Sequence, residues 1–332
     1  MRPYVLVLSL AGAVGFVAGP VLAADGVLEI NQTCATAVNG CFPGDFQNLP
    51  VTITSSAGGT SFRLTSDLVV PNENTIGVFI RIDGGSLDLG GFEIRGPVTC
   101  SGTPNVCSAV GTGSGVLGNA SRIEVFGGSV VGMGKHGVDL FEASVVRNVR
   151  AGHNGERGIT IGRDSRVSGS VTERNGVFGI HAEDGSTVDA STASNNTFSG
   201  ISAGYGVRVS RSTAAKNGEA GISVSGEGGA VTDCSATFNT SDGIILASGN
   251  RASGNLAWSN GNDGIEALGS GSYLIGNNVR DNAAAGLRIA FPAAYKDNAI
   301  TSNTGGTVLG GAQVNLGGNF CTDYANLVVV CP

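Results

Sequence analysis

The chain has 332 residues, including 55 glycines but only 9 prolines, and it carries a formal net charge of −7 at pH 7. The scarcity of proline excludes a disordered proline- and glycine-rich chain, and the acidic balance argues against nucleic acid as a partner. With only three histidines and no Cys-x-x-Cys motif, the sequence does not indicate a structural metal site.

Residues 1–23 predict a secretory signal peptide. Met1 and Arg2 give a basic start, an apolar stretch follows, and the small residues of "PVLA" end at Ala23. A membrane anchor is the alternative, but the apolar stretch is interrupted by glycine and serine and is short for a span. We therefore expect a secreted or periplasmic protein whose mature chain has no membrane span.

Seven cysteines fit a protein that folds in an oxidising compartment. Six of them fall in three close pairs, and each pair brackets a loop-like or terminal segment. Six cysteines allow fifteen pairings, and sequence alone does not choose among them. Local pairing is the arrangement we expect: Cys34–Cys41, Cys100–Cys107 and Cys321–Cys331.

The first part of the mature chain is less regular than the rest. Residues 24–61 are expected to form an N-terminal cap. Residues 62–96 alternate apolar and polar side chains, which predicts short strands in irregular first coils. Residues 97–120 contain two cysteines and many turn-forming residues, and we expect an inserted loop there.

Residues 136–307 repeat a unit of 21 or 22 residues. A glycine followed by an aliphatic residue recurs at Gly137, Gly158, Gly179, Gly200, Gly221, Gly243, Gly264 and Gly286. An asparagine keeps the same period at Asn154, Asn175, Asn196, Asn217, Asn239, Asn260, Asn282 and Asn303. Two columns that share one period indicate a repeat architecture.

Each repeat predicts three short strands. After the glycine, apolar residues flank a polar one, as in Ile180, His181 and Ala182, which is typical of a strand with one buried face. Two further columns, eight and three residues before each asparagine, predict two more strands. We therefore expect an all-β fold, a single-stranded parallel β-helix over residues 62–320 with eleven or twelve coils. Its winding should be right-handed, and residues 321–332 should cap its far end.

The repeat units resemble a known group of proteins. Units such as "VSGSVTERNGVFGI" (167–180) and the opening "SLDLGGFEIRG" (86–96) resemble the right-handed parallel β-helix repeat proteins. That group includes pectate lyases and many exported bacterial proteins. The resemblance covers roughly residues 62–320 and implies the architecture, whereas one fold hosts many activities.

The repeated asparagines have a structural explanation. Stacked coils would let each side-chain amide donate to one neighbouring coil and accept from the other, forming an inward-facing ladder. Another column lies five residues before each asparagine and contains mostly serine and asparagine, with Cys234 in one unit. We predict that Cys234 is a buried, inert thiol that replaces a small polar residue.

Function is expected from outward positions that vary between coils. Asp242 and Asp263 precede the repeated glycine in consecutive units, and Glu266 and Arg288 occupy an adjoining outward column. Stacking predicts that these four residues form an acidic patch with one arginine at a solvated corner. Oxygen ligands suit Ca²⁺, so Asp242 and Asp263 are candidate calcium ligands; no other cofactor is indicated. Pectate-lyase-like enzymes use Ca²⁺, carboxylates and an arginine, but the sequence has no close match to their catalytic motifs.

The remaining candidates carry less chemistry. His136, His153 and His181 fall in three different columns without a stacked carboxylate partner, so we expect surface histidines. Trp258 is the one tryptophan, and no aromatic ladder follows one face. These patterns favour a non-catalytic binding or structural protein that faces a polysaccharide or cell-surface glycan. The alternative is a polysaccharide lyase or glycoside hydrolase acting on an acidic polymer, which a long loop walling a cleft over carboxylates would support.

Overall fold

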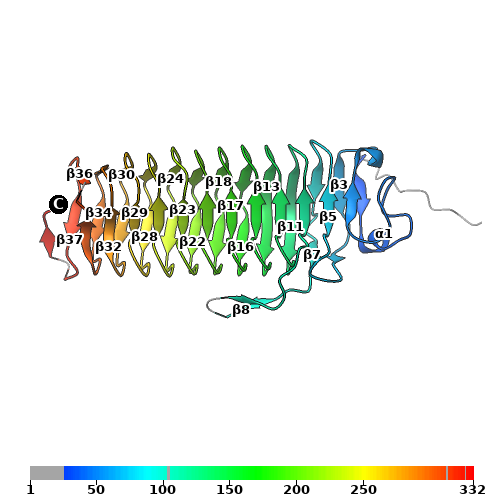
Figure 1. Ribbon diagram of the computed structural model, residues 1–332, viewed down its shortest axis with the longest axis horizontal. Coiled ribbons are helices and arrows are strands. Elements are labelled where there is room, and N and C mark those ends of the chain that lie inside the picture. The colour runs from blue at the N-terminus through cyan, green and yellow to red at the C-terminus, as the bar shows by residue number, and fades with distance from the viewer. Residues whose placement is uncertain (1–25, 103–104, 312, 326) are drawn as a thin grey trace, which may run out of the picture.

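The computed structural model describes residues 26–102, 105–311, 313–325 and 327–332, and the predicted signal peptide lies outside them. The chain forms a long rod of stacked coils (Figure 1). Among the described residues, helical structure is limited to α1 (Gln32–Ala35) and the 3-10 turn η1 (Ser55–Ala57), so the predicted all-β class is confirmed. No helix in these ranges has the length and apolarity that a membrane span requires.

One face of the rod is a 12-stranded parallel sheet, which we call sheet B. Each coil contributes one strand to it, and the count agrees with the eleven or twelve coils that the sequence predicts. Its strands are β2 (Val51–Ile53), β5 (Val78–Ile80), β10 (Val116–Gly118), β12 (Val138–Leu140), β14 (Ile159–Ile161), β17 (Ile180–Ala182), β20 (Ile201–Ala203), β23 (Ile222–Val224), β26 (Ile244–Leu246), β29 (Ile265–Ala267), β32 (Ala285–Ile289) and β35 (Gly306–Leu309).

The other faces belong to a bent sheet, which we call sheet A. Its first row contains β1 (Leu28–Ile30), β3 (Ser61–Leu64), β6 (Ser86–Asp88), β11 (Glu124–Val131), β13 (Val145–Gly152), β15 (Arg166–Ser168), β18 (Thr187–Asp189), β21 (Arg208–Ser210), β24 (Ala230–Thr232), β27 (Arg251–Ser253), β30 (Tyr273–Ile275), β33 (Ala293–Lys296) and β36 (Gln313–Asn315). The long strands β11 and β13 continue into the second row. That row also contains β4 (Leu68–Val69), β7 (Glu93–Arg95), β16 (Val171–Glu173), β19 (Thr192–Ser194), β22 (Thr213–Ala215), β25 (Ser235–Thr237), β28 (Leu256–Trp258), β31 (Asn278–Arg280), β34 (Ala299–Thr301) and β37 (Phe320–Thr322).

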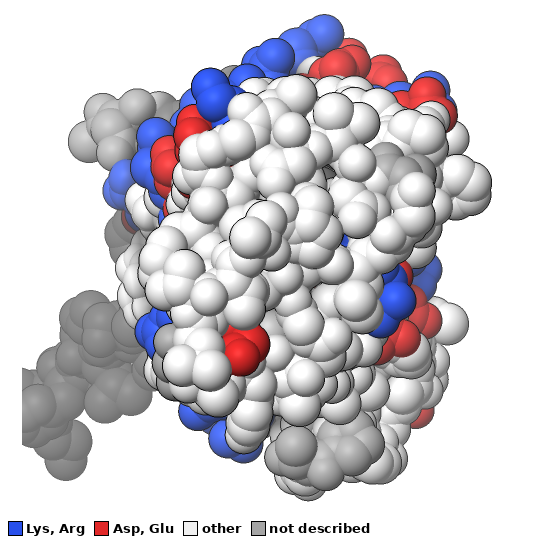
Figure 2. Space-filling model, turned by 90° about the vertical axis from the view of Figure 1, so that its left-hand side faces the viewer, with Lys and Arg blue, Asp and Glu red and all other residues white. Residues whose placement is uncertain are grey.

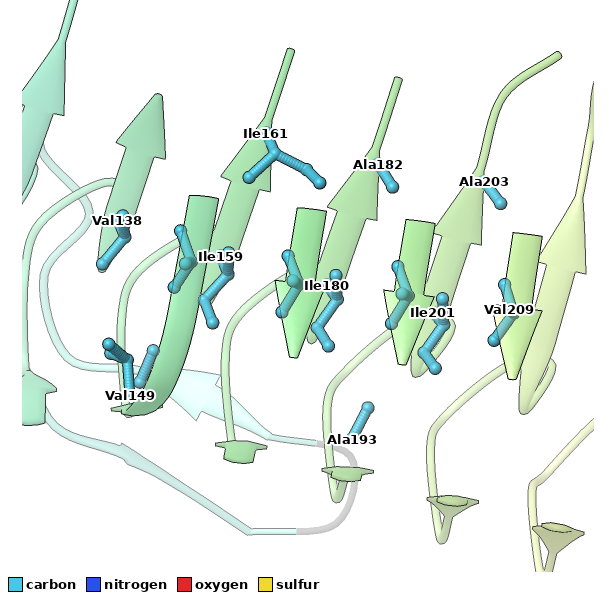
Figure 3. Close-up of a cluster of buried hydrophobic side chains, with 14 of the residues drawn as sticks. Val138, Val149, Ile159, Ile161, Ile180, Ala182, Ala193, Ile201, Ala203 and Val209 are labelled. Carbon is cyan, nitrogen blue, oxygen red and sulfur yellow. The ribbon is translucent and has the colours of Figure 1, made fainter. Parts of the chain in front are cut away.

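The register is the one that the repeat predicts. Ile159 pairs with Ile180, and Ile180 pairs with Ile201, so equivalent residues of successive coils lie side by side. Their side chains form continuous aliphatic columns inside the rod (Figure 3). These columns are buried between sheets A and B, and this burial is the main source of stability in such a fold.

The asparagine ladder is confirmed. Each of the eight repeated asparagines is at most 2% exposed. Each side-chain amide donates to the amide oxygen of the next coil at 2.9–3.0 Å, from Asn154 to Asn303. A second ladder begins at Cys234, whose backbone N–H donates to Asn255 Oδ1, and continues through Asn277 and Asn298. Cys234 is buried and unpaired, as predicted.

The three expected disulfides are present. Cys34–Cys41 lies at the N-terminal end beside α1, and Cys321–Cys331 closes the C-terminal end, where β38 (Val328–Val329) pairs with β37. Cys100–Cys107 joins β8 (Cys100–Ser101) to β9 (Val106–Cys107) in a hairpin that projects from the rod (Figure 1).

Two expected boundaries differ from the structure. Strands β1 and β2 already pair in parallel with β3 and β5, so the stack begins before residue 62. Strand β10 pairs within sheet B, so the C-terminal part of the expected loop 97–120 belongs to a coil. In all three strands only three residues are extended, and neither repeated column marks them, which is why alternation alone did not reveal them.

Candidate functional site

The outer face of sheet B collects the polar residues that vary from coil to coil. Because side chains alternate along a strand, the middle residue of each strand points away from the core. From β12 to β32 these middle residues stack in one row, which we call the outer row: Asp139, Thr160, His181, Ser202, Ser223, Ile245, Glu266 and Arg288.

The four predicted site residues do come together on this face. Glu266 and Arg288 are paired neighbours in the outer row. The Arg288 guanidinium bonds Asp263, and its Nε lies 3.8 Å from Glu266 Oε1. Burial raises the pKa of the Glu266 carboxyl first, and the charges of Asp242 and Asp263 raise it further. The sequence therefore located a real cluster, which we call the Asp263 cluster.

The expected solvated corner is wrong. Asp242 is 3% exposed and Asp263 is fully buried. Asp242 accepts hydrogen bonds from the Asp263 backbone N–H at 3.0 Å, from Asn262 at 2.9 Å and from Ser241 at 2.7 Å. Asp263 accepts from the Ala285 backbone N–H at 2.7 Å. The short carboxylates fold under the turn because they supply acceptors for corner N–H groups that the strands leave unpaired.

Calcium does not fit the Asp263 cluster as the sequence suggested. The carboxylates of Asp242 and Asp263 accept from donors of this chain, and the Arg288 cation already compensates Asp263. Within the described ranges, no group of three or more histidine, cysteine, aspartate or glutamate side chains could hold a metal ion. We therefore interpret the Asp263 cluster as a structural device.

A second group on the same face was missed by the sequence analysis. His136 is only 4% exposed, and its Nε2 lies 3.9 Å from Asp139 Oδ2 and 3.7 Å from Glu156 Oε2. His136 is therefore neither a surface residue nor without carboxylate neighbours. Asp139 is three residues away across the corner, and Glu156 is offset by 20 residues. A search restricted to one column at a spacing of 21 overlooks both, and the signal that finds them is adjacency between columns.

Burial controls the protonation of this group, which we call the His136 cluster and which includes His136, Asp139, Glu156, Arg157 and His181. Burial, and then the charges of Lys135 and Arg157, lower the pKa of His136 to about 3. Burial and the Arg157 charge lower the pKa of His181 to about 4. Burial raises the pKa of Asp139. Both imidazoles are therefore neutral near pH 7.

Two buried polar atoms in this region lack a hydrogen-bond partner. They are His136 Nδ1 and Thr160 Oγ1, and Gln313 Oε1 is the third such atom among the described residues. Thr160 lies between Asp139 and His181 in the outer row. Unpaired buried polar groups are costly in a native protein, so their presence points to a surface that a ligand completes.

Aromatic rings and free cations border the His136 cluster. Phe178 stacks on His181 at 5.9 Å between ring centroids and contacts Phe198 edge to face at 6.2 Å. The Arg157 guanidinium lies 5.7 Å from the Phe178 ring. Neither Lys135 nor Arg157 forms an ion pair with any described residue, whereas most arginines in these ranges do.

The wider charge pattern does not single out one flank. Figure 2 looks onto the C-terminal end and shows lysine and arginine mixed with aspartate and glutamate along the sides of the rod. Lys135 and Arg157 are therefore distinguished by their lack of ion-pair partners, not by a large basic patch.

The disulfide-bonded hairpin packs beside the corner that precedes sheet B. His153 Nδ1 lies 2.9 Å from the Cys100 carbonyl oxygen, and Thr197 Oγ1 donates to the Asn105 carbonyl at 3.2 Å. These contacts place the hairpin on the coils that contain Glu156 and Phe198. Part of the expected insertion thus forms a raised border next to the candidate site.

Comparison with known proteins agrees with the architecture. Residues 185–321 match the family model described as a right-handed β-helix region. The fold is shared with the A-module of mannuronan C-5 epimerase AlgE4 of Azotobacter vinelandii, at 16% identity over 81% of this chain and 92% of that one, with a TM-score of 0.57. It is also shared with a mutant of the periplasmic alginate epimerase AlgG, at 14% identity, 89% and 82% coverage and a TM-score of 0.63. No curated protein sequence matches the chain. The chain is a right-handed parallel β-helix protein, as predicted, and at these identities the likeness shows the fold alone.

Proposed function

We propose that this right-handed β-helix protein binds an acidic polysaccharide along the outer face of sheet B, over the His136 cluster. The observation that carries the proposal is the pair of unpaired cations, Lys135 and Arg157, beside buried polar atoms that lack partners. Carboxylates of a uronic acid polymer would supply both the missing charge and the missing hydrogen bonds.

The surroundings of the cluster support a sugar ligand. Phe198 is 40% exposed and, with Phe178, offers apolar ring surface beside the cations. Aromatic rings combine apolar contact area with a defined orientation. The outer row runs along the rod with about 4.8 Å between coils, so an extended polymer can follow it. Two solved proteins of this fold are named as alginate epimerases, which also supports an acidic polymer.

The compartment follows the same proposal. Three disulfides indicate an oxidising environment, and one protein of the same fold is named as periplasmic. We place this protein in the periplasm or outside the cell, after removal of residues 1–23.

A polysaccharide lyase is a second candidate, and one specific observation favours it. His181 is a neutral imidazole in the outer row, and Asp139 has a raised pKa two coils away. His181 could take the proton at C5 of a uronate while Arg157 stabilises the carboxylate. The electron pair forms the C4–C5 double bond, the bond from C4 to oxygen breaks, and the departing oxygen takes a proton from Asp139.

Glycoside hydrolysis is less well supported. A hydrolase requires two carboxyl groups on either side of the scissile bond. Asp139 and Glu156 instead both approach Nε2 of the buried His136 ring. We therefore do not assign a hydrolase pair.

The test compares polyuronates with a neutral polymer. Wild-type protein, Arg157→Ala and the control Arg208→Ala are run through gels that contain alginate, polygalacturonate or dextran. We expect retardation by at least one polyuronate, and we expect Arg157→Ala to weaken it about tenfold. Ultraviolet absorbance of unsaturated products in parallel incubations separates a lyase from a binding protein. Absence of retardation by every polyuronate, or equal loss in both variants, contradicts the proposal.

A further inference from the structure

A different flank of the rod carries two depressions in line. They lie where the second row of sheet A turns towards sheet B, a surface we call the corner flank. The first depression has a volume of about 310 Å³ and is lined by residues that include Asn195, Lys216 and Thr240. The second has a volume of about 620 Å³ and includes Ser259, Asp281 and Tyr324.

The depressions are aligned because they use the same positions of successive coils. Lys216 and Ser259 each precede a ladder asparagine, and Gly218 and Gly261 each follow one. The ladder bonds connect these coils one to the next, from Asn196 to Asn303. Five steps of about 4.8 Å make a surface about 24 Å long, which suits an extended chain better than a compact ligand.

Aromatic side chains lie between the two depressions. Phe238 occupies the position equivalent to Lys216 and Ser259, is 45% exposed, and has a φ of 56°. A bulky residue in the left-handed region is unusual, and such residues often mark functional surfaces. Phe238 contacts Trp258 edge to face at 4.7 Å between centroids.

The tryptophan that supports Phe238 is held firmly. Trp258 Nε1 donates to Asp281 Oδ2 at 3.0 Å, and the Arg280 guanidinium lies 4.6 Å from the centre of its ring. Asp281 itself lines the second depression. The aromatic pair and the depressions therefore form one continuous surface.

We propose that the corner flank binds a neutral, hydroxyl-rich polysaccharide chain that runs parallel to the rod axis. Lys216 and Asp281 are the charged residues that line the two depressions, and their charges cancel. The other described lining groups are mainly amides, hydroxyls and glycine backbone, which match sugar hydroxyls. Phe238 supplies the apolar platform for a ring face. This site is separate from the His136 cluster and does not depend on the proposed binding of acidic polymers.

The single tryptophan makes this inference directly testable. Trp258 fluorescence is recorded while oligosaccharides of a neutral glucan, xylan or mannan are added. We expect a saturable change with at least one of them. Phe238→Asn should weaken this binding about tenfold, because asparagine tolerates the left-handed conformation and already occupies the equivalent position at Asn195.

Controls separate this site from the outer face of sheet B. Phe141→Ala removes another exposed phenylalanine, away from the corner flank, and should leave the neutral-glycan affinity unchanged. Tyr324→Ala should reduce it, and Arg157→Ala should not. The proposal is overturned if no neutral glycan changes Trp258 emission, or if Phe238→Asn binds as tightly as wild type. Phe238-dependent binding of an extended peptide alone would assign the surface to another partner and would equally overturn it.

Discussion

Replacing Asn217 with alanine should destabilise the rod far more than its single lost side chain suggests. Asn217 is fully buried, and its Oδ1 accepts from the Asn196 backbone N–H at 3.1 Å and from Asn196 Nδ2 at 3.0 Å. Its Nδ2 donates to Asn239 Oδ1 at 3.0 Å and to the Ala193 carbonyl at 3.1 Å. The substitution therefore breaks the ladder in both directions.

The magnitude follows from the groups that lose partners. Two buried donors of Asn196 are left unsatisfied, and each costs about 1–3 kcal/mol. The expected loss is therefore about 2–6 kcal/mol, a large part of a typical folding free energy of about 5–15 kcal/mol. For a rod of this size it corresponds to a melting temperature lower by roughly 3–10 °C.

Thermal unfolding followed by circular dichroism measures this effect. The control is Ser223→Ala in the outer row, whose side chain has no hydrogen bond among the described contacts and should change the melting temperature by less than about 1 °C. Asn217→Asp adds a test of direction, because the introduced carboxylate faces Asn239 Oδ1 and should destabilise more at pH 7 than at low pH. Equal melting temperatures for Asn217→Ala and Ser223→Ala would refute the reasoning.

Three further predictions concern buried groups. Because the pKa of His136 is lowered to about 3, its contribution to stability is complete above about pH 6.5 and is lost as pH falls towards 3; urea midpoints for His136→Gln should therefore fall less steeply on acidification than those of wild type, and parallel curves would contradict this. Burial raises the pKa of Cys234 to about 11, so a thiol reagent at pH 8 should label it only after denaturation, and rapid labelling of folded protein would be inconsistent with the ladder. Asp263→Ala should lower stability by about 2–4 kcal/mol in urea titrations without changing polyuronate retardation, whereas lost retardation at unchanged stability would make the Asp263 cluster a binding site.

The architecture could be predicted from the sequence because the repeat encodes it twice. The asparagine and glycine columns gave the period, and alternation around residues such as Ile180 gave the strands. Parallel stacking then determines which residues are neighbours, so Glu266 and Arg288 could be paired without a structure. Local disulfides followed from the cysteine spacing.

The environment of each side chain was harder to predict. Asp263 and His136 share the column before the glycine, and both looked outward in a pattern of period two. At a corner the chain turns between strands, so alternation no longer gives the direction of a side chain, and both residues are buried. The contact between His136 and Glu156 crosses columns, and no single-column comparison contains that information.

The central claim is that the outer face of sheet B over the His136 cluster binds an acidic polysaccharide. The most direct measurement is calorimetric titration of a purified oligouronide into wild type, Arg157→Ala and Arg208→Ala at low ionic strength. The proposal predicts saturable binding that Arg157→Ala weakens about tenfold and Arg208→Ala leaves unchanged. Binding that is absent from wild type, or that is insensitive to Arg157→Ala, would contradict it.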